Sequence, residues 1–202
     1  MKWDCVFVSS VLISLIVTKA YASPLKWSFE EGGNNHYYDQ VSDNISWTDA
    51  SLAAKQLSYL GLDGHLVTIT SQAENDFITK NWNTGLYWIG AYQADKSSEP
   101  AGNWRWVTNE SWNYTNWAVN QPDNGGGVED WAGFQGATGP GGSKFWNDWE
   151  VSGGGGVYPK GYFVEYEPRV VPEPLSMLLF SVGGIMIGFA RNRRNVKEII
   201  KK

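Results

Sequence analysis

Two apolar segments at opposite ends of the chain leave residues 23–168 as the candidate folded domain. The first, CVFVSSVLISLIV, follows Lys2 and precedes small residues at Ala20 and Ala22, a pattern typical of a signal peptide cleaved after Ala22. A membrane anchor is the alternative, but the run is shorter than the roughly 20 residues of a transmembrane helix. We therefore predict that residues 1–22 form a signal peptide, removed by signal peptidase on export.

The second segment follows the motif VPEP and joins an apolar run, 175–190, to Arg191, Arg193 and Arg194. A span this short requires tilt or local thinning of the bilayer, and the arginines are expected on the cytoplasmic side. The order of these parts in 169–202 resembles the PEP-CTERM sorting tails of Gram-negative, exopolysaccharide-producing bacteria, on which an exosortase acts. The resemblance implies membrane attachment before processing and a final location in the cell envelope, at the cell surface or in the extracellular matrix. A plain C-terminal anchor is the alternative.

The candidate domain is acidic and contains no cysteine. It holds 18 Asp and Glu against 7 Lys and Arg, a formal charge of −11, whereas the whole chain carries −5. A domain this acidic is unsuited to nucleic acid and well suited to cations. Because Cys5 lies in the signal peptide, the domain has no disulfide, cysteine nucleophile or cysteine-based zinc site. His36 and His65 occur singly in separate segments, and we interpret them as packed or surface residues rather than metal ligands.

Hydrophobic periodicity predicts a helix over residues 46–61. Ser46 is expected to cap its N-terminus, with Asp49 three residues later, and Gly61 is expected to end it. The apolar positions that fit the helical period, and are expected to form one buried face, are Ala50, Leu52, Ala53, Leu57 and Leu60.

A second helix is expected after Ser71, where Glu74 completes a capping box. Strand patterns occur in NNHYYDQVSDN, HLVTI, LYWIGAY, NWRWV and GYFVEYE. Helices followed by short strands predict an α+β fold with an antiparallel sheet. No periodicity persists between residues 109 and 130, and an unstructured stretch of about 20 residues in a compact domain is usually functional.

A series of short motifs resembles the C-type lectin-like domain family over roughly residues 35–167. The motifs, in order, are Trp47 with Ala50, HLVTI, SQAENDF, WIG at 88–90, NWRW, YTNW at 114–117, QPD at 121–123 and WND at 146–148. The resemblance implies a C-type lectin-like fold: two helices, short antiparallel sheets and a long ligand-binding loop. The chain departs from the family in lacking its four half-cystines. The usual bridges would pair Ala54 with Val164 and Trp131 with Val151, and we expect packing to replace them.

The resemblance also implies a calcium site in the long loop. Calcium takes six to eight oxygen ligands. In the family, two vicinal hydroxyls of a sugar fill the remaining coordination positions, and the side chains that bind the ion also form hydrogen bonds with these hydroxyls. The ligand positions correspond here to Gln121, Asp123, Glu129, Asn147 and Asp148, with Asn124 and Asp130 where an auxiliary calcium is bound. A cis peptide before Pro122 would let Gln121 and Asp123 point the same way.

In the family, QPD accompanies galactose-type sugars. Galactose-selective members place an aromatic residue after this motif, whereas this chain has Gly125–Gly127; Trp131 or Trp149 would substitute only if the fold brings them close. We predict a non-enzymatic, calcium-dependent protein whose partner is a carbohydrate or exopolysaccharide. Three alternatives remain open: QPDNGGG as a solvated turn beside a core tryptophan in WND, an adhesion or structural protein that uses the fold for protein contact, and a hydrolase.

Overall fold

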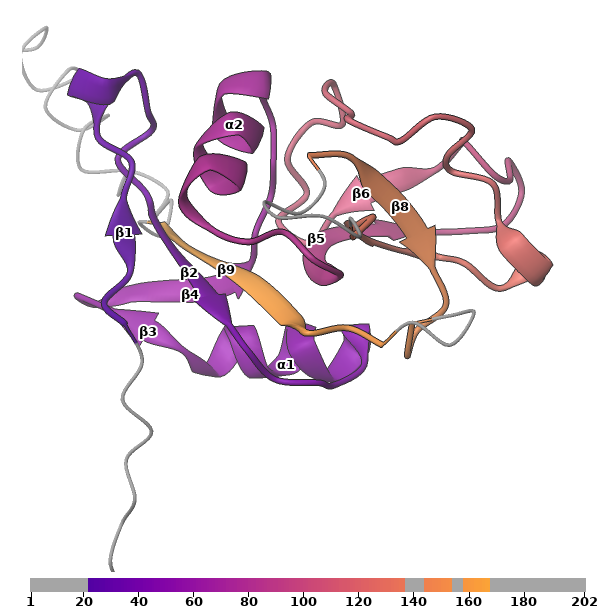
Figure 1. Cartoon of the computed structure of the whole chain (residues 1–202), viewed down its shortest axis with the longest axis horizontal. Coiled ribbons are helices and arrows are strands. Elements are labelled where there is room, and N and C mark those ends of the chain that lie inside the picture. The colour runs from indigo at the N-terminus through magenta and orange to yellow at the C-terminus, as the bar shows by residue number, and fades with distance from the viewer. Residues whose placement is uncertain (1–21, 137–143, 154–157, 168–202) are drawn as a thin grey trace, which may run out of the picture. The chain divides into compact units, whose positions relative to one another are not determined.

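The computed structural model describes residues 22–136, 144–153 and 158–167, which belong to one compact unit ending at Glu167 (Figure 1). The predicted signal peptide, except Ala22, and the predicted tail at 169–202 lie outside these residues. Within the described ranges, no helix is long and apolar enough to cross a membrane.

The described residues form nine strands in one connected sheet, in the order β1-β2-β9-β5-β7-β8. In addition, β3 pairs with β4, β4 with β9, and β6 with β5. The strands are β1 (Leu25–Lys26), β2 (Tyr37–Val41), β3 (Ser58–Tyr59), β4 (Leu62–Leu66), β5 (Tyr87–Gln93), β6 (Trp104–Trp106), β7 (Trp131–Phe134), β8 (Trp146–Trp149) and β9 (Gly161–Glu167). All pairings are antiparallel except β5 with β9, where Tyr87 lies opposite Gly161. The central strand β9 thus connects β2 and β4 on one side with β5 on the other.

Helix α1 (Trp47–Gln56) begins where the sequence predicts but ends five residues before the predicted end. Ser46 Oγ accepts the backbone N–H of Asp49 at 3.1 Å, which caps the first turn. The segment after the helix instead forms the β3–β4 hairpin, with Leu60 and Gly61 at positive φ (52° and 80°) in its two-residue turn. The predicted helix end at Gly61 was therefore wrong.

The predicted buried face of α1 was also wrong in two of its positions. Leu52 is 62% exposed and Leu60, in the hairpin turn, is 71% exposed. The helix instead buries Trp47, Ala50, Ser51 and Ala54.

Helix α2 (Gln72–Asn81) has only the first half of the predicted capping box. Ser71 Oγ accepts the N–H of Glu74 at 3.2 Å. The Glu74 carboxylate does not return a bond to Ser71, because it accepts the N–H of Thr70 at 2.8 Å and the hydroxyl of Tyr38 at 2.6 Å. Glu74 is thus drawn into the interior rather than used as a surface cap. Two 3-10 turns, η1 (Phe29–Glu31) and η2 (Gly125–Gly127), complete the described elements.

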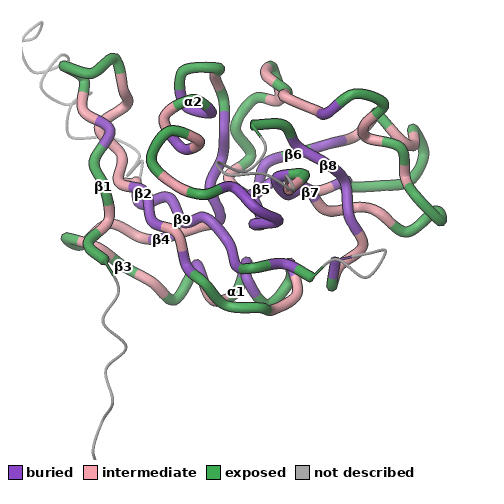
Figure 2. The backbone as a smooth tube through the Cα atoms, viewed as in Figure 1, coloured by how far each residue is buried: buried purple, intermediate pink, exposed green. Residues whose placement is uncertain are grey.

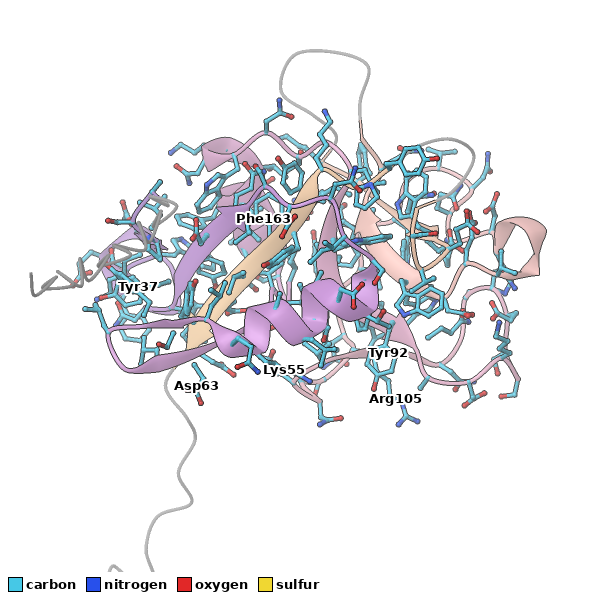
Figure 3. The ribbon with its side chains drawn as sticks, turned by 90° about the horizontal axis from the view of Figure 1, so that it is seen from below. Tyr37, Lys55, Asp63, Tyr92, Arg105 and Phe163 are labelled. Carbon is cyan, nitrogen blue, oxygen red and sulfur yellow. The ribbon has the colours of Figure 1, made fainter. Side chains whose placement is uncertain are left out.

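The helices lie on opposite sides of the buried strands (Figures 1 and 2). One hydrophobic cluster includes Ile78 of α2 and Phe163 of β9, labelled in Figure 3; the other gathers around α1. Ala54 and Val164, where the resemblance places a disulfide, are fully buried in the α1 cluster, and Trp131 packs against it. Apolar packing therefore fills three of the four places of the expected cysteines, while the fourth, Val151, is half-buried in the turn after β8.

Candidate metal and carbohydrate site

Trp146 anchors the base of the long loop. It is fully buried, and its indole N–H donates to Asn75 Oδ1 at 2.9 Å. Its backbone N–H donates to Asn116 O and its carbonyl accepts the N–H of Ala118, both at 2.8 Å. Trp117 packs edge-on against its ring, with centroids 5.8 Å apart. The tryptophan of WND is therefore a core residue that also sets where β8 meets the loop.

Asp148 ties β8 to the tip of that loop. The residue is fully buried, and its carboxylate accepts the N–H of Asp123 at 3.2 Å and the N–H of Asn124 at 2.7 Å. Both donors follow the Gln121–Pro122 peptide, which is cis, the condition under which Gln121 and Asp123 were expected to point the same way. These bonds hold Asp123 beside Asp148, although the two lie 25 residues apart in sequence.

The three glycines of η2 allow the loop to close around Glu129. Gly125 N–H donates to Glu129 Oε2 at 2.7 Å, and Asn124 Oδ1 accepts the N–H of Glu129 at 3.1 Å. A Cβ at Gly125 would lie 2.8 Å from Glu129 Oε2, and Gly126 and Gly127 adopt φ of +66° and +74°. The turn-forming sequence thus builds a loop that points a carboxylate inward.

Asp123, Glu129 and Asp148 form an acidic group: each offers one oxygen within 4.8 Å of the others. Burial raises the pKa of Glu129 to about 7; the charges of Asp148 and Asp123 add to this, while the N–H of Gly125 opposes it. Burial also raises the pKa of Asp148, against the lowering effect of the Asn124 and Asp123 amides. Such a group is stabilised by a cation or by protons.

The two remaining predicted ligands carry amide oxygens without a hydrogen-bond donor. Gln121 Oε1 and Asn147 Oδ1 are buried and accept no bond from the described residues. Asn147 Nδ2 donates to the carbonyl of Asp148 at 2.6 Å, which fixes Oδ1 as the free acceptor. Buried acceptors without donors require an explanation, and a bound ion is one. Three carboxylates and two amide oxygens are hard donors suited to calcium.

The two residues assigned to an auxiliary calcium have other partners. Asn124 uses its side-chain oxygen to fix the loop backbone, and Asp130 Oδ2 lies 3.0 Å from Lys96 Nζ. The structure adds Gln93 and Glu99, whose side-chain oxygens are buried near Asp130 without donors. Sequence reasoning missed both: Gln93 lies beside Asp130 because its N–H donates to Asp130 O at 2.8 Å, and Glu99 lies near Asp130 from the loop between β5 and β6.

The two histidines, separate in sequence, meet at β9. His36 Nδ1 lies 2.7 Å from Glu165 Oε1, and His65 Nε2 lies 3.4 Å from Glu167 Oε1. Burial alone lowers the pKa of His65, but the neighbouring Glu167 carboxylate and the charge of Glu165 raise it to about 8. The histidines are packed, as predicted, but they belong to one charged network that no sequence spacing indicated.

Both tryptophans suggested as sugar-stacking residues pack in or against the α1 cluster. Trp149 is buried in the α1 cluster, and Trp131, opposite it in the β7–β8 ladder, packs against the same cluster. Trp149 is therefore excluded as a stacking residue, whereas Trp131 is half-buried and held against this cluster.

The comparison with known families agrees with this architecture. A family model described as the Lectin C-type domain matches residues 43–148, just over half of the chain. The chain belongs to the C-type lectin domain family. Domains of this family generally bind calcium, and the group at Asp123, Glu129 and Asp148 lies inside or at the edge of the matched region.

Relatives of this C-type lectin domain come from distant organisms. Asialoglycoprotein receptor 2 of Mus musculus is 34% identical over 109 residues, 52% of this chain and 31% of that protein. A lectin of Pleurodeles waltl is 34% identical over 119 residues, 56% of this chain and 63% of that protein. Halomucin of Haloquadratum walsbyi is 33% identical over 148 residues, 66% of this chain and 1% of that protein. The chain thus spans less than two thirds of each of these relatives.

Solved structures show the same fold. The lectin CEL-I of Cucumaria echinata aligns with a TM-score of 0.53 at 26% identity, over 67% of this chain and 92% of that one. The cow CD23 carbohydrate-recognition domain, solved in the presence of a GlcNAc2Man3 oligosaccharide, aligns with a TM-score of 0.53 at 26% identity, over 72% and 96%. A calcium-independent type II antifreeze protein shares the fold at 19% identity and a TM-score of 0.50. The fold alone therefore does not determine whether a domain binds calcium.

Proposed function

We propose that this C-type lectin domain binds carbohydrate through a calcium ion. The observation that carries the proposal is the donor set: three carboxylates within 4.8 Å of one another, from two segments, and two buried amide oxygens without donors. A divalent ion would reduce the formal charge of the three carboxylates from −3 to −1. The solvated-turn alternative does not account for the buried acceptors, because a solvated turn leaves its polar atoms in water.

Gln121, Asp123, Glu129, Asn147 and Asp148 would hold the ion. When bound, calcium supplies open coordination positions for two sugar hydroxyls. This chain's contribution is to keep the site formed beforehand: Asp148 fixes Asp123 through its amide, and Gly125 holds the Glu129 carboxylate. Carboxylate groups beside the ion would then accept hydrogen bonds from the same hydroxyls, and amide NH2 groups would donate hydrogen bonds to them. Such a site retains a glycan and leaves its bonds intact.

Calcium titration by calorimetry tests the metal site. We expect one strong site in the native protein and its loss in Asp148→Asn, which keeps the size of the side chain but removes one charge and one of the two oxygens that accept loop N–H groups. The control is Asp43→Asn, an exposed aspartate outside the loop. Calcium binding that survives unchanged in Asp148→Asn would remove the basis of the proposal.

A glycan array, run with calcium and then with chelator, tests the sugar. We expect retention of vicinal-diol sugars in calcium and none in chelator, and QPD makes galactose-type sugars the first to examine. With Trp149 buried in the α1 cluster and Trp131 packed against it, we expect weak discrimination between galactose and mannose. Calcium binding without any glycan retention would favour the protein-contact alternative, and glycan cleavage would favour a hydrolase.

We also propose that the chain is exported and then sorted to the cell envelope, surface or extracellular matrix of a Gram-negative bacterium. The basis is the predicted signal peptide at 1–22 and the tail at 169–202, whose Pro172–Pro174 motif, apolar run and arginines resemble a sorting signal. Mass spectrometry of the mature protein tests both processing steps. We expect an N-terminus at Ser23 and a cut near the motif; an intact tail would instead indicate a permanent anchor.

A further inference from the structure

A second polar cluster lies beside the calcium site, where the β5–β6 hairpin meets the residue before β7. It consists of Gln93, Lys96, Glu99 and Asp130. The backbone N–H of Gln93 donates to Asp130 O at 2.8 Å, which fixes the hairpin against the end of the long loop. Glu99 lies close enough to Asp130 and to the Gln93 amide for both to affect its pKa, which burial and the Asp130 charge raise.

The cluster has more acceptors than donors. Gln93 is 8% exposed, and its Nε2 donates to Gly102 O at 2.8 Å and to Pro100 O at 3.3 Å. Both amide hydrogens are then used, so Oε1 is the atom left without a donor. Glu99 Oε1 and Oε2 and Asp130 Oδ1 are likewise buried without donors among the described residues. Two neighbouring carboxylates and a buried amide oxygen together are stabilised by a positive charge or by a shared proton.

Lys96 supplies a positive charge at this point. Its ammonium lies 3.0 Å from Asp130 Oδ2, and the side chain reaches in from solvent, being 61% exposed, whereas Asp130 is 13% exposed. Lys96 is carried by the same hairpin as Glu99, so it stays next to Asp130 at a high effective concentration. A free divalent ion at Asp130 would have to displace the ammonium or bind against its repulsion.

We propose that Lys96 is the resident cation of this cluster: its ammonium neutralises Asp130 and keeps a second calcium ion out, so the domain binds one calcium. The unpartnered oxygens of Gln93, Glu99 and Asp130 form a cation site that becomes available when the lysine is removed. At the end of the binding loop, the Lys96 ammonium thereby takes the place of a metal ion.

Counting calcium ions per full-length chain by calorimetry tests this inference. The native protein and Lys96→Arg, which keeps the charge, are expected to bind one equivalent. Lys96→Met is expected to bind two, and the second equivalent is expected to disappear in Lys96→Met combined with Glu99→Gln. A native protein that binds two ions, or a Lys96→Met variant that binds no more than the native protein, would overturn the proposal.

The same measurement in an Asp148→Asn background separates this inference from the proposed function. Asp148→Asn alone, which retains Lys96, is expected to bind no calcium. Asp148→Asn combined with Lys96→Met is expected to bind one equivalent. A native chain that binds no calcium, with one ion gained on Lys96→Met, would reject the first site and support the role of Lys96. If Lys96→Met adds no calcium ion in either the native or the Asp148→Asn protein, the inference about Lys96 fails. The first site then depends only on the comparison of the native protein with Asp148→Asn.

Discussion

Replacing Glu129 by glutamine should change thermal stability in opposite directions with and without calcium. Without calcium, the new side chain would keep an acceptor for the N–H of Gly125 and would place an N–H group, rather than a negative charge, near Asp148 and Asp123. The folded state raises the pKa of Glu129 from 4.5 to about 7, and one pKa unit corresponds to about 1.4 kcal/mol. Because the side chain is only partly buried, solvent screens much of this cost, leaving about 1–2 kcal/mol.

The calcium-free variant should therefore melt about 3–6 °C above the native protein at pH 8, where the native carboxylate is ionised. With calcium the order reverses. At a concentration 100 times the dissociation constant, the ion stabilises the native protein by about 2.7 kcal/mol. If loss of one charged ligand weakens binding about 100-fold, the variant gains only about 0.4 kcal/mol.

Calorimetric melting in chelator and in calcium measures both effects, with Glu30→Gln as the control. Glu30 lies exposed in η1, away from the loop, so its substitution should leave the calcium-dependent shift unchanged. A lower melting temperature for Glu129→Gln in chelator would refute the argument from charge repulsion. An undiminished calcium shift would show that Glu129 is not a ligand.

Two further predictions concern the fold. The pKa of His65 is raised from 6.5 to about 8, so its stabilising effect is complete below pH 6.5 and is lost as the pH rises through 8. Urea unfolding should show about 1–2 kcal/mol less stability at pH 9 than at pH 6, and His65→Gln should lose that part of the slope; an equal slope in both proteins would contradict this. A Cβ at Gly161 would lie 1.9 Å from the carbonyl oxygen of Val41, so Gly161→Ala should cost at least about 3 kcal/mol in urea unfolding. Gly32→Ala, at φ +80° with open space, should cost about 1 kcal/mol, and equal costs would refute the steric reason.

The positions of most strands along the chain, and that of the main loop, were predictable because each has a local signal. The alternation in NWRWV gives two buried tryptophans around exposed Arg105, as found in β6 (Figure 3). The lack of periodicity in the stretch at 109–130 matches a segment with only the short turn η2. The end of α1 was not predictable from periodicity, because Leu60 continues an apolar pattern while lying in a hairpin turn. There the positive φ of Leu60 and Gly61, rather than burial, decides the conformation.

The candidate ligands were predictable as residue types, but their roles before any ion binds were not. The resemblance to C-type lectin-like domains implied that Asp123 and Asp148 meet, yet it could not show that the Asp148 carboxylate accepts two loop amides. Those bonds depend on where β8 lies, which Trp146 fixes through Asn75 of α2. A residue outside the motif thus sets the geometry of a residue inside it.

Charged networks were the least predictable part, since they depend on strand register. His36 and His65 precede or occupy two strands that both flank β9, and only this pairing brings them to Glu165 and Glu167. Lys96 reaches Asp130 for a similar reason, because the end of β5 bonds to the residue before β7. In both cases the partner of a buried carboxylate comes from a neighbouring strand or hairpin, at no fixed spacing in sequence. The charge balance of a site in this fold therefore follows from its neighbouring strands as much as from its ligand motif.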